Sequence, residues 1–350
     1  MSKFWSKAVE HAKPYVPGEQ LNDPGIIKLN TNENPYPPSP KVREAINLEI
    51  ERLHLYPDPK ADALNNTVAA YYGVAKEQVF VGNGSDEVLA FSFMAFFDQG
   101  KKIRYPAITY SFYPVYANLF HIPVEEVPLN RNFSLPVEAF FQSEGGVIFP
   151  NPNAPTSRYL NLDAIKEIAE NNPDNVVIID EAYVDFAKES AVELTIQCEN
   201  LLVIQTLSKS RSLAGLRVGF AIGHPNLIEG LNRIKDSFNS YTIDRLAMAG
   251  ARASILNKEY FKETTAKIIY TREWVKEEMK KRGFHVLPSQ TNFLFACHYQ
   301  KSASQLYEDL KEDGVLIRHF NKPKIDNYIR ITIGTDEQMK TFIKKLDKLI

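Results

Sequence analysis

The chain alternates short apolar runs with segments of helical periodicity. Six of the runs are rich in valine and isoleucine, as expected of strands that are covered on both faces of a sheet. They lie at 78–81, 102–105, 147–149, 176–179, 201–206 and 218–222. Helix-length segments such as Leu162–Glu170 separate several of them. Because such intervals suit crossover connections, the pattern predicts an α/β fold in which helices sandwich a mostly parallel sheet.

The last hundred residues follow a different pattern, typical of a small α+β domain. The elements expected there are a helix at 258–282, a helix near 304–312, strands near 316–318 and 328–333, and a final helix. Thr335 and Gln338 form a capping box at the start of that final helix. We predict a large domain at 30–245. The small domain is predicted to consist of 246–350 together with an N-terminal arm at 1–29.

Composition is ordinary for a globular protein. Of the 350 residues, 44% are apolar and 24% are charged, which excludes a disordered chain. The 41 basic and 43 acidic residues nearly cancel, so nucleic acid is not expected as a partner. The longest apolar run, at 88–97, is far shorter than the roughly 20 residues that span a bilayer. The N-terminus has no apolar stretch of signal-peptide length, so we expect a cytoplasmic protein with no membrane partner.

Cysteine and histidine usage argues against a metal site. Cys198 and Cys297 are too few for a disulfide framework or a thiolate metal cluster, which fits a reducing compartment. The seven histidines are scattered, without the H-x-x-x-H or H-E-x-x-H spacing of metal ligands. We therefore expect no metal.

A first segment with candidate chemistry is VFVGNGSDEVL, at 79–89, which combines a strand end, a glycine turn and a helix start. Exposed backbone N–H groups at such a helix start bind phosphate. A dinucleotide-binding fold would need G-x-G-x-x-G, and Glu87 occupies the place of the third glycine. The alternative is an ordinary strand–helix turn capped by Ser85.

Two further segments place reactive side chains directly after apolar strands. In VVIIDEAYVDF, Asp180 stands at the C-terminal end of a strand, where open α/β sheets place ligands, and Tyr183 follows. A helix cap or a metal ligand is the alternative interpretation of Asp180. In TLSKSRSLAGLRVGFAIG, Lys209 follows a strand and Arg217 lies eight residues on. Burial and a neighbouring cation favour a neutral, nucleophilic lysine amine, although most lysines in loops are simply exposed.

Four separated motifs resemble one superfamily. GNGSDE, NPNAPTS at 151–157, DEAYVDF and TLSKSRSLAGLR occur in the order and rough spacing of the fold-type-I pyridoxal-phosphate aminotransferases. The resemblance extends from Lys28 to Gly334. LNTNENPYPP, LAGLRVGFAI, TNFLF and YIRITIG are similar to the histidinol-phosphate aminotransferase branch, although aromatic aminotransferases and threonine-phosphate decarboxylases share most of these strings. The intact lysine, aspartate and arginine favour an enzyme over a non-catalytic regulator that retains the fold.

The resemblance implies roles around the ring of pyridoxal phosphate. Lys209 is implied to hold the cofactor as a Schiff base and to shuttle a proton. Asp180 is implied to pair with the ring nitrogen, and Tyr183 to hydrogen-bond the ring oxygen. Tyr113 is implied to stack on the ring, with Tyr110 as the alternative.

The resemblance also places the cofactor phosphate at the glycine turn. Its implied ligands are the backbone N–H groups of Gly84 and Ser85 at the helix start, the hydroxyls of Thr206 and Ser208, and the guanidinium of Arg217. Asp86, next along the chain, is implied as a further cofactor-binding residue. Tyr56, in LYPDP, matches a tyrosine that in the family reaches the phosphate from the other subunit. The resemblance therefore implies a homodimer.

Two positions depart from the family pattern. Ala154 stands where the family usually has an asparagine that contacts the ring oxygen. Either Asn153 takes over that contact or Tyr183 makes it alone. Arg211 adds a cation two residues after Lys209, pointing either into the site or away from it.

Substrate recognition is implied to rest on the small domain. Arg330 matches an arginine that grips a carboxylate, and Arg318 lies twelve residues before it. Two guanidinium groups suit a phosphate monoester or a dicarboxylate, whereas a strand arginine can also simply pair with a surface carboxylate. Tyr15 and Asn292 match further substrate-contacting positions. The implied reaction transfers an amino group between histidinol phosphate and 2-oxoglutarate, with glutamate and imidazole acetol phosphate as products, in histidine biosynthesis. An aromatic or broad-specificity aminotransferase is the main alternative.

Overall fold

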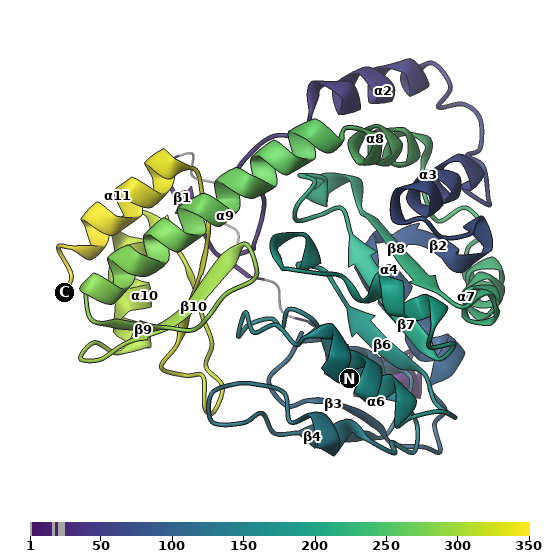
Figure 1. Cartoon of the computed structure of the whole chain (residues 1–350), viewed down its shortest axis with the longest axis horizontal. Coiled ribbons are helices and arrows are strands. Elements are labelled where there is room, and N and C mark those ends of the chain that lie inside the picture. Colours follow the sequence, from purple (N-terminus) through teal and green to yellow (C-terminus); the bar gives the residue numbers. More distant parts are fainter. Residues whose placement is uncertain (1, 16–17, 20–24) are drawn as a thin grey trace.

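The structure is a computed structural model that describes residues 2–15, 18–19 and 25–350 (Figure 1). Its α-helices are α1 (Lys7–His11), α2 (Pro40–Ile50), α3 (Asp62–Tyr72), α4 (Gly84–Phe96), α5 (Phe112–Leu119), α6 (Leu162–Glu170), α7 (Pro225–Phe238), α8 (Arg245–Leu256), α9 (Lys258–Lys281), α10 (Ala303–Glu312) and α11 (Asp336–Leu346). Its strands are β1 (Ile27–Lys28), β2 (Val79–Asn83), β3 (Ile103–Pro106), β4 (Val124–Val127), β5 (Val147–Pro150), β6 (Val177–Asp180), β7 (Leu201–Thr206), β8 (Val218–Gly223), β9 (Phe284–Val286), β10 (Phe293–His298), β11 (Val315–Leu316), β12 (Arg318–His319) and β13 (Ile329–Thr332).

A seven-stranded sheet forms the centre of the larger unit. In the described part of the chain its strand order is β2-β8-β7-β6-β5-β3-β4. The strands from β3 to β7 run parallel, and β8 is antiparallel to both of its neighbours. This sheet confirms the predicted α/β fold class. Because β6 and β7 are parallel neighbours, Asp180 and Thr206 come to the same edge of the sheet.

Burial on both faces explains why the central strands lack polar alternation. Every residue of β7 and β8 is buried. Apolar side chains of α3, α6 and α8 pack on one face of the sheet, and those of α4, α5 and α7 pack on the other. The two cores hold the strand ends rigidly, which is what a reactive site at that edge requires.

The smaller unit is built on an antiparallel sheet with the order β12-β13-β10-β9. Val275 of α9, Leu306 of α10 and Phe342 of α11 belong to the buried core against it. β1 pairs in parallel with β11, so Ile27 and Lys28 lie with this unit. The segment from 29 to 39 then leads from the small unit to α2, which packs on α8.

The change from one core to the other falls later than the predicted boundary at 245–246. That boundary lies at the start of α8, whose Ala247 and Ala251 pack in the core of the large sheet. Ile268 of α9 packs in the core of the small unit. Figure 1 shows α9 leading from α8 to the small sheet. We therefore place the change of core at Asn257, between the two helices.

Local differences from the sequence-based elements have simple causes. β4 was not predicted, because its sequence VEEV is half acidic; it is an edge strand that pairs only with β3. The strand expected at 316–318 is divided into β11 and β12, which belong to different sheets. The capping box of Thr335 and Gln338 is confirmed by both of its hydrogen bonds. None of the described helices combines the length and apolar character needed to cross a membrane.

Candidate active site

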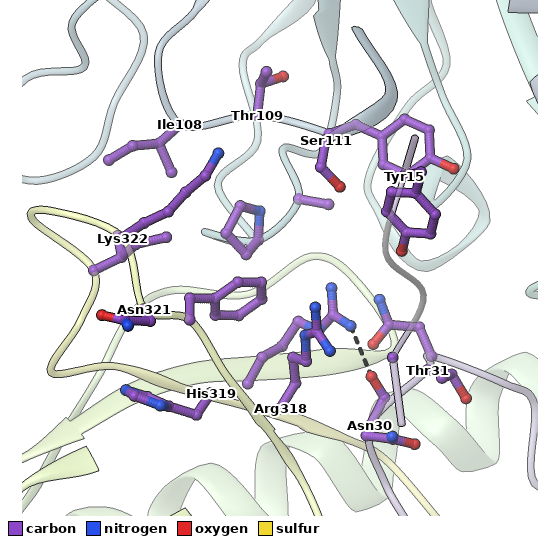
Figure 2. Close-up of a pocket in the computed structure, with 18 of the residues that line it drawn as sticks. Tyr15, Asn30, Thr31, Ile108, Thr109, Ser111, Arg318, His319, Asn321 and Lys322 are labelled. Carbon is purple, nitrogen blue, oxygen red and sulfur yellow. Dashed lines mark hydrogen bonds between the residues drawn. The ribbon is translucent and has the colours of Figure 1, made fainter. Parts of the chain in front are cut away.

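A cavity of about 500 Å³ lies where the N-terminal segment, the ends of the central strands and the small sheet meet (Figure 2). Its lining includes Tyr15 and Thr31 from the N-terminal segment, Tyr183 and Lys209 from the large unit, and Arg318 and Arg330 from the small unit. A second cavity of about 100 Å³ shares Tyr183 and Lys209 with the first. It is lined further by Ser85, Asp86, Asp180, Thr206, Ser208 and Arg217. The structure thus brings most of the sequence-predicted residues to two adjoining cavities.

Lys209 presents its amine at the junction of the two cavities. Its Nζ donates a 3.4 Å hydrogen bond to the carbonyl oxygen of Thr31 and lies 5.8 Å from the ring centre of Tyr183. The side-chain amide of Asn34 fixes the backbone beside it by donating to the carbonyl oxygens of Lys209 and Ser210, at 2.9 and 3.1 Å. The backbone is therefore anchored, while the amine is held only by a long hydrogen bond.

Asp180 is buried at the end of β6. Its Oδ2 accepts a 2.9 Å hydrogen bond from the hydroxyl of Tyr113, and its Oδ1 accepts one of 3.2 Å from the backbone N–H of Ala182. Burial raises the pKa of Asp180 to about 6, although both hydrogen bonds act in the opposite direction. A carboxylate in such a position is stabilised by a cation placed next to it.

The N-terminus of α4 and Arg217 form a cradle suited to an anion. Gly84 has φ +78° and lies so close to Arg217 that a Cβ would come within 2.6 Å of Nη2. Gly219 is packed against the same turn, where a Cβ would lie 2.3 Å from the backbone nitrogen of Ser85. Nη2 of Arg217 pairs with Oδ2 of Asp86 at 2.9 Å. Backbone N–H groups at the helix start and a guanidinium thus converge on one point.

Two hydroxyls, one at the end of β7 and one two residues beyond it, complete this cradle. Thr206 Oγ1 donates to Ser208 Oγ at 2.9 Å and accepts a 3.2 Å bond from the backbone N–H of Ser208. Both residues are buried and line the smaller cavity. Their hydroxyls lie at the carboxyl edge of the sheet beside Asp180, as the motif order predicted.

The predicted stacking residue Tyr113 lies elsewhere. It is 0% exposed and lines neither cavity. Its hydroxyl donates to Asp180 from within the core of the large unit. Tyr110 lines both cavities, and its hydroxyl donates a 2.8 Å hydrogen bond to Oδ1 of Asp86. The two tyrosines flank the start of α5, so sequence spacing alone did not separate them. The placement favours Tyr110 over Tyr113 for contact with a ring in the cavity.

The residues at the 151–157 motif include one that lines the cavities and one that lies outside both linings. Ala154 lines both cavities. Asn153 is buried and donates from Nδ2 to the carbonyl of Ile108 at 3.2 Å and to Thr156 Oγ1 at 2.7 Å. Its Oδ1 has no partner among the described residues. Asn153 therefore lies behind the alanine, with its amide N–H groups already engaged.

Arg211 points away from the site. Its guanidinium lies 3.9 Å from the ring centre of Phe261 and 5.0 Å from that of Tyr71. It donates a 2.9 Å hydrogen bond to the carbonyl of Ser254, in the last turn of α8. Arg211 thus ties the loop after Lys209 to the junction of α8 and α9, and adds no charge to the cavity.

The larger cavity is strongly cationic. Among the described residues, four basic side chains line it (Lys209, Arg318, Lys322 and Arg330), and no aspartate or glutamate does. Arg330 donates from Nη2 to the carbonyl of Asn30 at 2.8 Å, the dashed line of Figure 2, and its buried Nε has no partner in the described chain. Burial lowers the pKa of Arg330. Such uncompensated charge favours an anionic ligand.

The remaining predicted residues divide into one inside the cavity and two outside it. Tyr15 lines the cavity and stacks on Phe112, with ring centres 4.5 Å apart. Asn292 is buried behind the lining, where its Nδ2 donates to the carbonyl of Asn32 at 3.0 Å. Tyr56 is 79% exposed and stacks on Tyr241, so it does not reach the cavities of its own chain.

Sequence reasoning missed two residues at this site. Asn32 lines the larger cavity and donates a 2.8 Å hydrogen bond to the hydroxyl of Tyr183. Its place in the LNTNENPYPP motif was the available signal. Lys322 extends from the segment between β12 and β13, and Figure 2 shows it pointing toward the loop of Ile108 and Thr109. No motif marked this lysine among the many exposed ones.

Comparison with known proteins agrees with this fold. The family model of aminotransferase class I and II matches residues 24–346. The chain is 59% identical to histidinol-phosphate aminotransferase 1 of Oceanobacillus iheyensis, over 100% of this chain and 99% of that one. It is 56% identical to the histidinol-phosphate aminotransferase of Clostridium acetobutylicum, over 100% of both. The crystal structure of histidinol-phosphate aminotransferase from Sinorhizobium meliloti, in complex with pyridoxal-5'-phosphate, superposes with a TM-score of 0.90 at 23% identity, covering 100% and 99% of the two chains.

The chain belongs to the class I and II aminotransferases. This confirms the enzyme class and the cofactor, pyridoxal phosphate, that its motifs implied. The site itself fits that cofactor. Asp180 is a buried carboxylate whose raised pKa a charged ring nitrogen would lower, Lys209 offers an amine, and Arg217 with the start of α4 offers an anion cradle.

Proposed function

We propose that this enzyme transfers an amino group between histidinol phosphate and 2-oxoglutarate, yielding imidazole acetol phosphate and glutamate. The observation that carries this proposal is the cationic cavity, whose described lining contains four basic side chains and no carboxylate. A phosphate dianion and a dicarboxylate both suit such a site. The names of the relatives from Oceanobacillus iheyensis and Clostridium acetobutylicum support the same substrate.

Around the cofactor, we assign roles by position. Pyridoxal phosphate supplies an electron sink when it is bound. Lys209 is the residue that would hold it covalently; once the substrate amine has replaced the lysine at the cofactor, the freed lysine amine would move a proton to and from the reacting carbon of the substrate. Asp180 pairs with the ring nitrogen, and Tyr183 donates to the ring oxygen. The junction of the two cavities at Lys209 and Tyr183 supports this assignment.

The phosphate of the cofactor is proposed to bind in the cradle at the start of α4. The proposed ligands are Gly84, Ser85, Thr206, Ser208 and Arg217. Asp86 holds Arg217 and Tyr110, and Tyr110 rather than Tyr113 contacts the ring face. The side-chain amide of Asn153 is already engaged with the carbonyl of Ile108 and with Thr156, which leaves the ring-oxygen contact to Tyr183.

Arg330 and Arg318 are proposed to bind the anionic end of each substrate in turn. Arg330 is half-buried and its buried Nε has no partner in the described chain, so an incoming oxyanion would satisfy that N–H. Arg318 lies over the ring of Phe320 at 5.6 Å, at the edge of the same cavity. Tyr15 forms part of the wall, and Asn292 acts indirectly by holding the backbone of Asn32.

The test is a comparison of amino donors. We expect kcat/KM for histidinol phosphate to exceed that for phenylalanine, and unphosphorylated histidinol to be a much poorer donor than its phosphate ester. Each lost charge-assisted contact should cost roughly one to two decades in kcat/KM. A ratio of histidinol phosphate to phenylalanine below one would move the enzyme to the aromatic aminotransferases.

We further propose a homodimer in which Tyr56 of each subunit reaches the cofactor phosphate of the other. Its supports are the 79% exposure of Tyr56 and a group of exposed apolar side chains near it, Leu48, Ile50, Leu53 and Leu55. Arg245 fixes the loop by donating to the carbonyl oxygens of Leu55 and Tyr56. A cytoplasmic location is also proposed, since both cysteines are free thiols.

A further inference from the structure

Asn32 occupies the point where the N-terminal segment passes between the two units. It is 2% exposed, and its φ of +56° is a left-handed conformation that asparagine tolerates better than most residues. The residue contacts β13 of the small unit through Thr332 and the large unit through Tyr183. A buried amide with partners on both sides fixes their relative placement.

The direction of each hydrogen bond around Asn32 is determined by one backbone group. The backbone N–H of Asn32 can only donate, and it donates to Thr332 Oγ1 at 3.0 Å. The hydroxyl proton of Thr332 is therefore free for the Asn32 side chain, and Oγ1 donates to Oδ1 at 3.1 Å. With Oδ1 engaged as acceptor, the side-chain nitrogen faces the hydroxyl of Tyr183 and donates to it at 2.8 Å.

This chain of bonds leaves the phenolic proton of Tyr183 unused. Its oxygen accepts from Asn32, and among the described residues no acceptor for its own proton is found. Tyr183 lines both cavities and is only 9% exposed, so that proton is available to an acceptor inside the site. A phenol that accepts one hydrogen bond is also polarised toward donating the next.

We propose that Asn32 is a positioning residue, which together with Thr332 fixes Tyr183 as a donor toward the ring oxygen of the cofactor. The proposal rests on the proposed role of Tyr183. If the side chain of Asn32 could rotate, its carbonyl would compete for the tyrosine proton. Thr332 prevents that rotation by donating to the Asn32 carbonyl oxygen. Thr332 lies on β13 two residues from Arg330, so one strand carries both the residue proposed to bind the substrate anion and the residue that orients the hydrogen bond to Tyr183.

The experiment is a spectroscopic pH titration of the cofactor-loaded enzyme without substrate. The visible absorbance reports the pKa of the Lys209–cofactor linkage, and a donor at the ring oxygen lowers that pKa. Tyr183→Phe should raise the midpoint. Thr332→Val keeps the branched shape but frees the amide to turn, and should raise it by on the order of half to one pH unit. Thr332→Ser should restore the wild-type midpoint.

Asn32→Gly removes the amide, fits the positive φ, and is the second variant if the buried valine impairs folding. It should raise the midpoint as Thr332→Val does. In a Tyr183→Phe background neither change should add a further shift, because the effect passes through the phenol. A shift that persists in that background would show a general structural role and overturn the proposal.

The controls separate this inference from the proposed function. If Tyr183→Phe leaves the midpoint unchanged, the role of Tyr183 is wrong and the inference fails with it. If Tyr183→Phe raises the midpoint while Thr332→Val and Asn32→Gly do not, the positioning role alone is refuted. The relative kcat/KM values for histidinol phosphate and phenylalanine test the substrate independently of either result.

Discussion

Tyr113 donates a 2.9 Å hydrogen bond to Asp180 from the interior side of the strand end. The phenol is completely buried, on α5, and the carboxylate is buried on β6. Burial and the neighbouring Asp180 both raise the pKa of Tyr113, so the phenol stays neutral and keeps donating. The hydrogen bond thereby holds one oxygen of the Asp180 carboxylate in place, while the Asp180 side chain still lines the smaller cavity.

The buried Asp180 should make the cofactor-free protein less stable at neutral pH. Burial raises its pKa from 3.8 to about 6, so the folded state binds more protons than the unfolded state between those values. The stability contribution of this carboxyl is therefore full below pH 4 and is lost as pH rises through 6. Asp180→Asn should stabilise the cofactor-free protein at pH 8 by up to about 3 kcal/mol, measured by urea unfolding.

The same substitution should have the opposite effect on cofactor binding, because an amide cannot pair ionically with a charged ring nitrogen. Asp180→Asn should therefore retain less cofactor after gel filtration and lose most of its turnover. The gain in stability at pH 8 should shrink toward pH 4. A variant that is no more stable than the wild type at pH 8 would contradict the proposed cost of burial.

Lys209 should be the residue that links covalently to the cofactor. The yellow enzyme should lose its visible band on borohydride reduction, and mass mapping should locate the reduced adduct at Lys209. Lys209→Ala should still bind cofactor in the cradle of Arg217, without a reducible link and without turnover. Lys322→Gln is the matched control, since Lys322 lines the same cavity but lies on the small unit. An adduct at any lysine other than Lys209 would overturn the assignment.

Strands and site residues could be predicted from the sequence where the signal lies in neighbouring positions of the chain. The strand at 201–206 was predicted with its observed bounds, because burial on both faces makes it continuously apolar. Asp180 and Lys209 were predicted because the first ends such a strand and the second lies three residues after one. The choice between Tyr110 and Tyr113 required the packing of α5 against β6, which spacing does not encode.

The roles of residues joined over long sequence distances were not predictable. Asn32 meets Thr332 across 300 positions, and neither residue type alone signals a hydrogen-bond relay. The direction of Arg211 likewise depended on Phe261 and Ser254, which approach it only after α8 and α9 have packed. A long-range pairing of this kind leaves no periodicity in the sequence.

Arg330 should contribute to both half-reactions. Its guanidinium lies over the rings of Phe293 and Phe320, at 5.3 and 5.5 Å from their centres, and its buried Nε has no partner in the described chain. Arg330→Ala should lower kcat/KM for histidinol phosphate and for 2-oxoglutarate by about one to two decades each. Arg330→Lys keeps the charge but not the paired donors, and should recover only part of the loss. A loss confined to one substrate would show that the anions bind at different places.

Lys322 should affect the substrate phosphate selectively. It lines the cavity on an exposed segment, so its contribution should be smaller than that of Arg330 and sensitive to salt. Lys322→Gln should raise KM for histidinol phosphate a few-fold and leave kcat nearly unchanged. Lys324→Gln is the matched control, because Lys324 lies on the same segment and does not line the cavity. Equal effects of the two substitutions would show that Lys322 acts only through the general surface charge and makes no specific contact with the substrate phosphate.

Tyr56 should act on the site of the other subunit. It is highly exposed, stacked on Tyr241 at 4.8 Å, and absent from both cavities of its own chain. Tyr56→Phe should leave the sedimentation of the dimer unchanged but weaken cofactor retention, by about the free energy of one charge-assisted hydrogen bond.

Mixing Tyr56→Phe with Lys209→Ala subunits tests whether Tyr56 acts across the subunit interface or within its own chain. If Tyr56 acts across the interface, each mixed dimer contains one site with both wild-type residues, and tight, borohydride-reducible cofactor should reappear. If it acts within its own chain, no mixed dimer contains such a site and retention should stay weak.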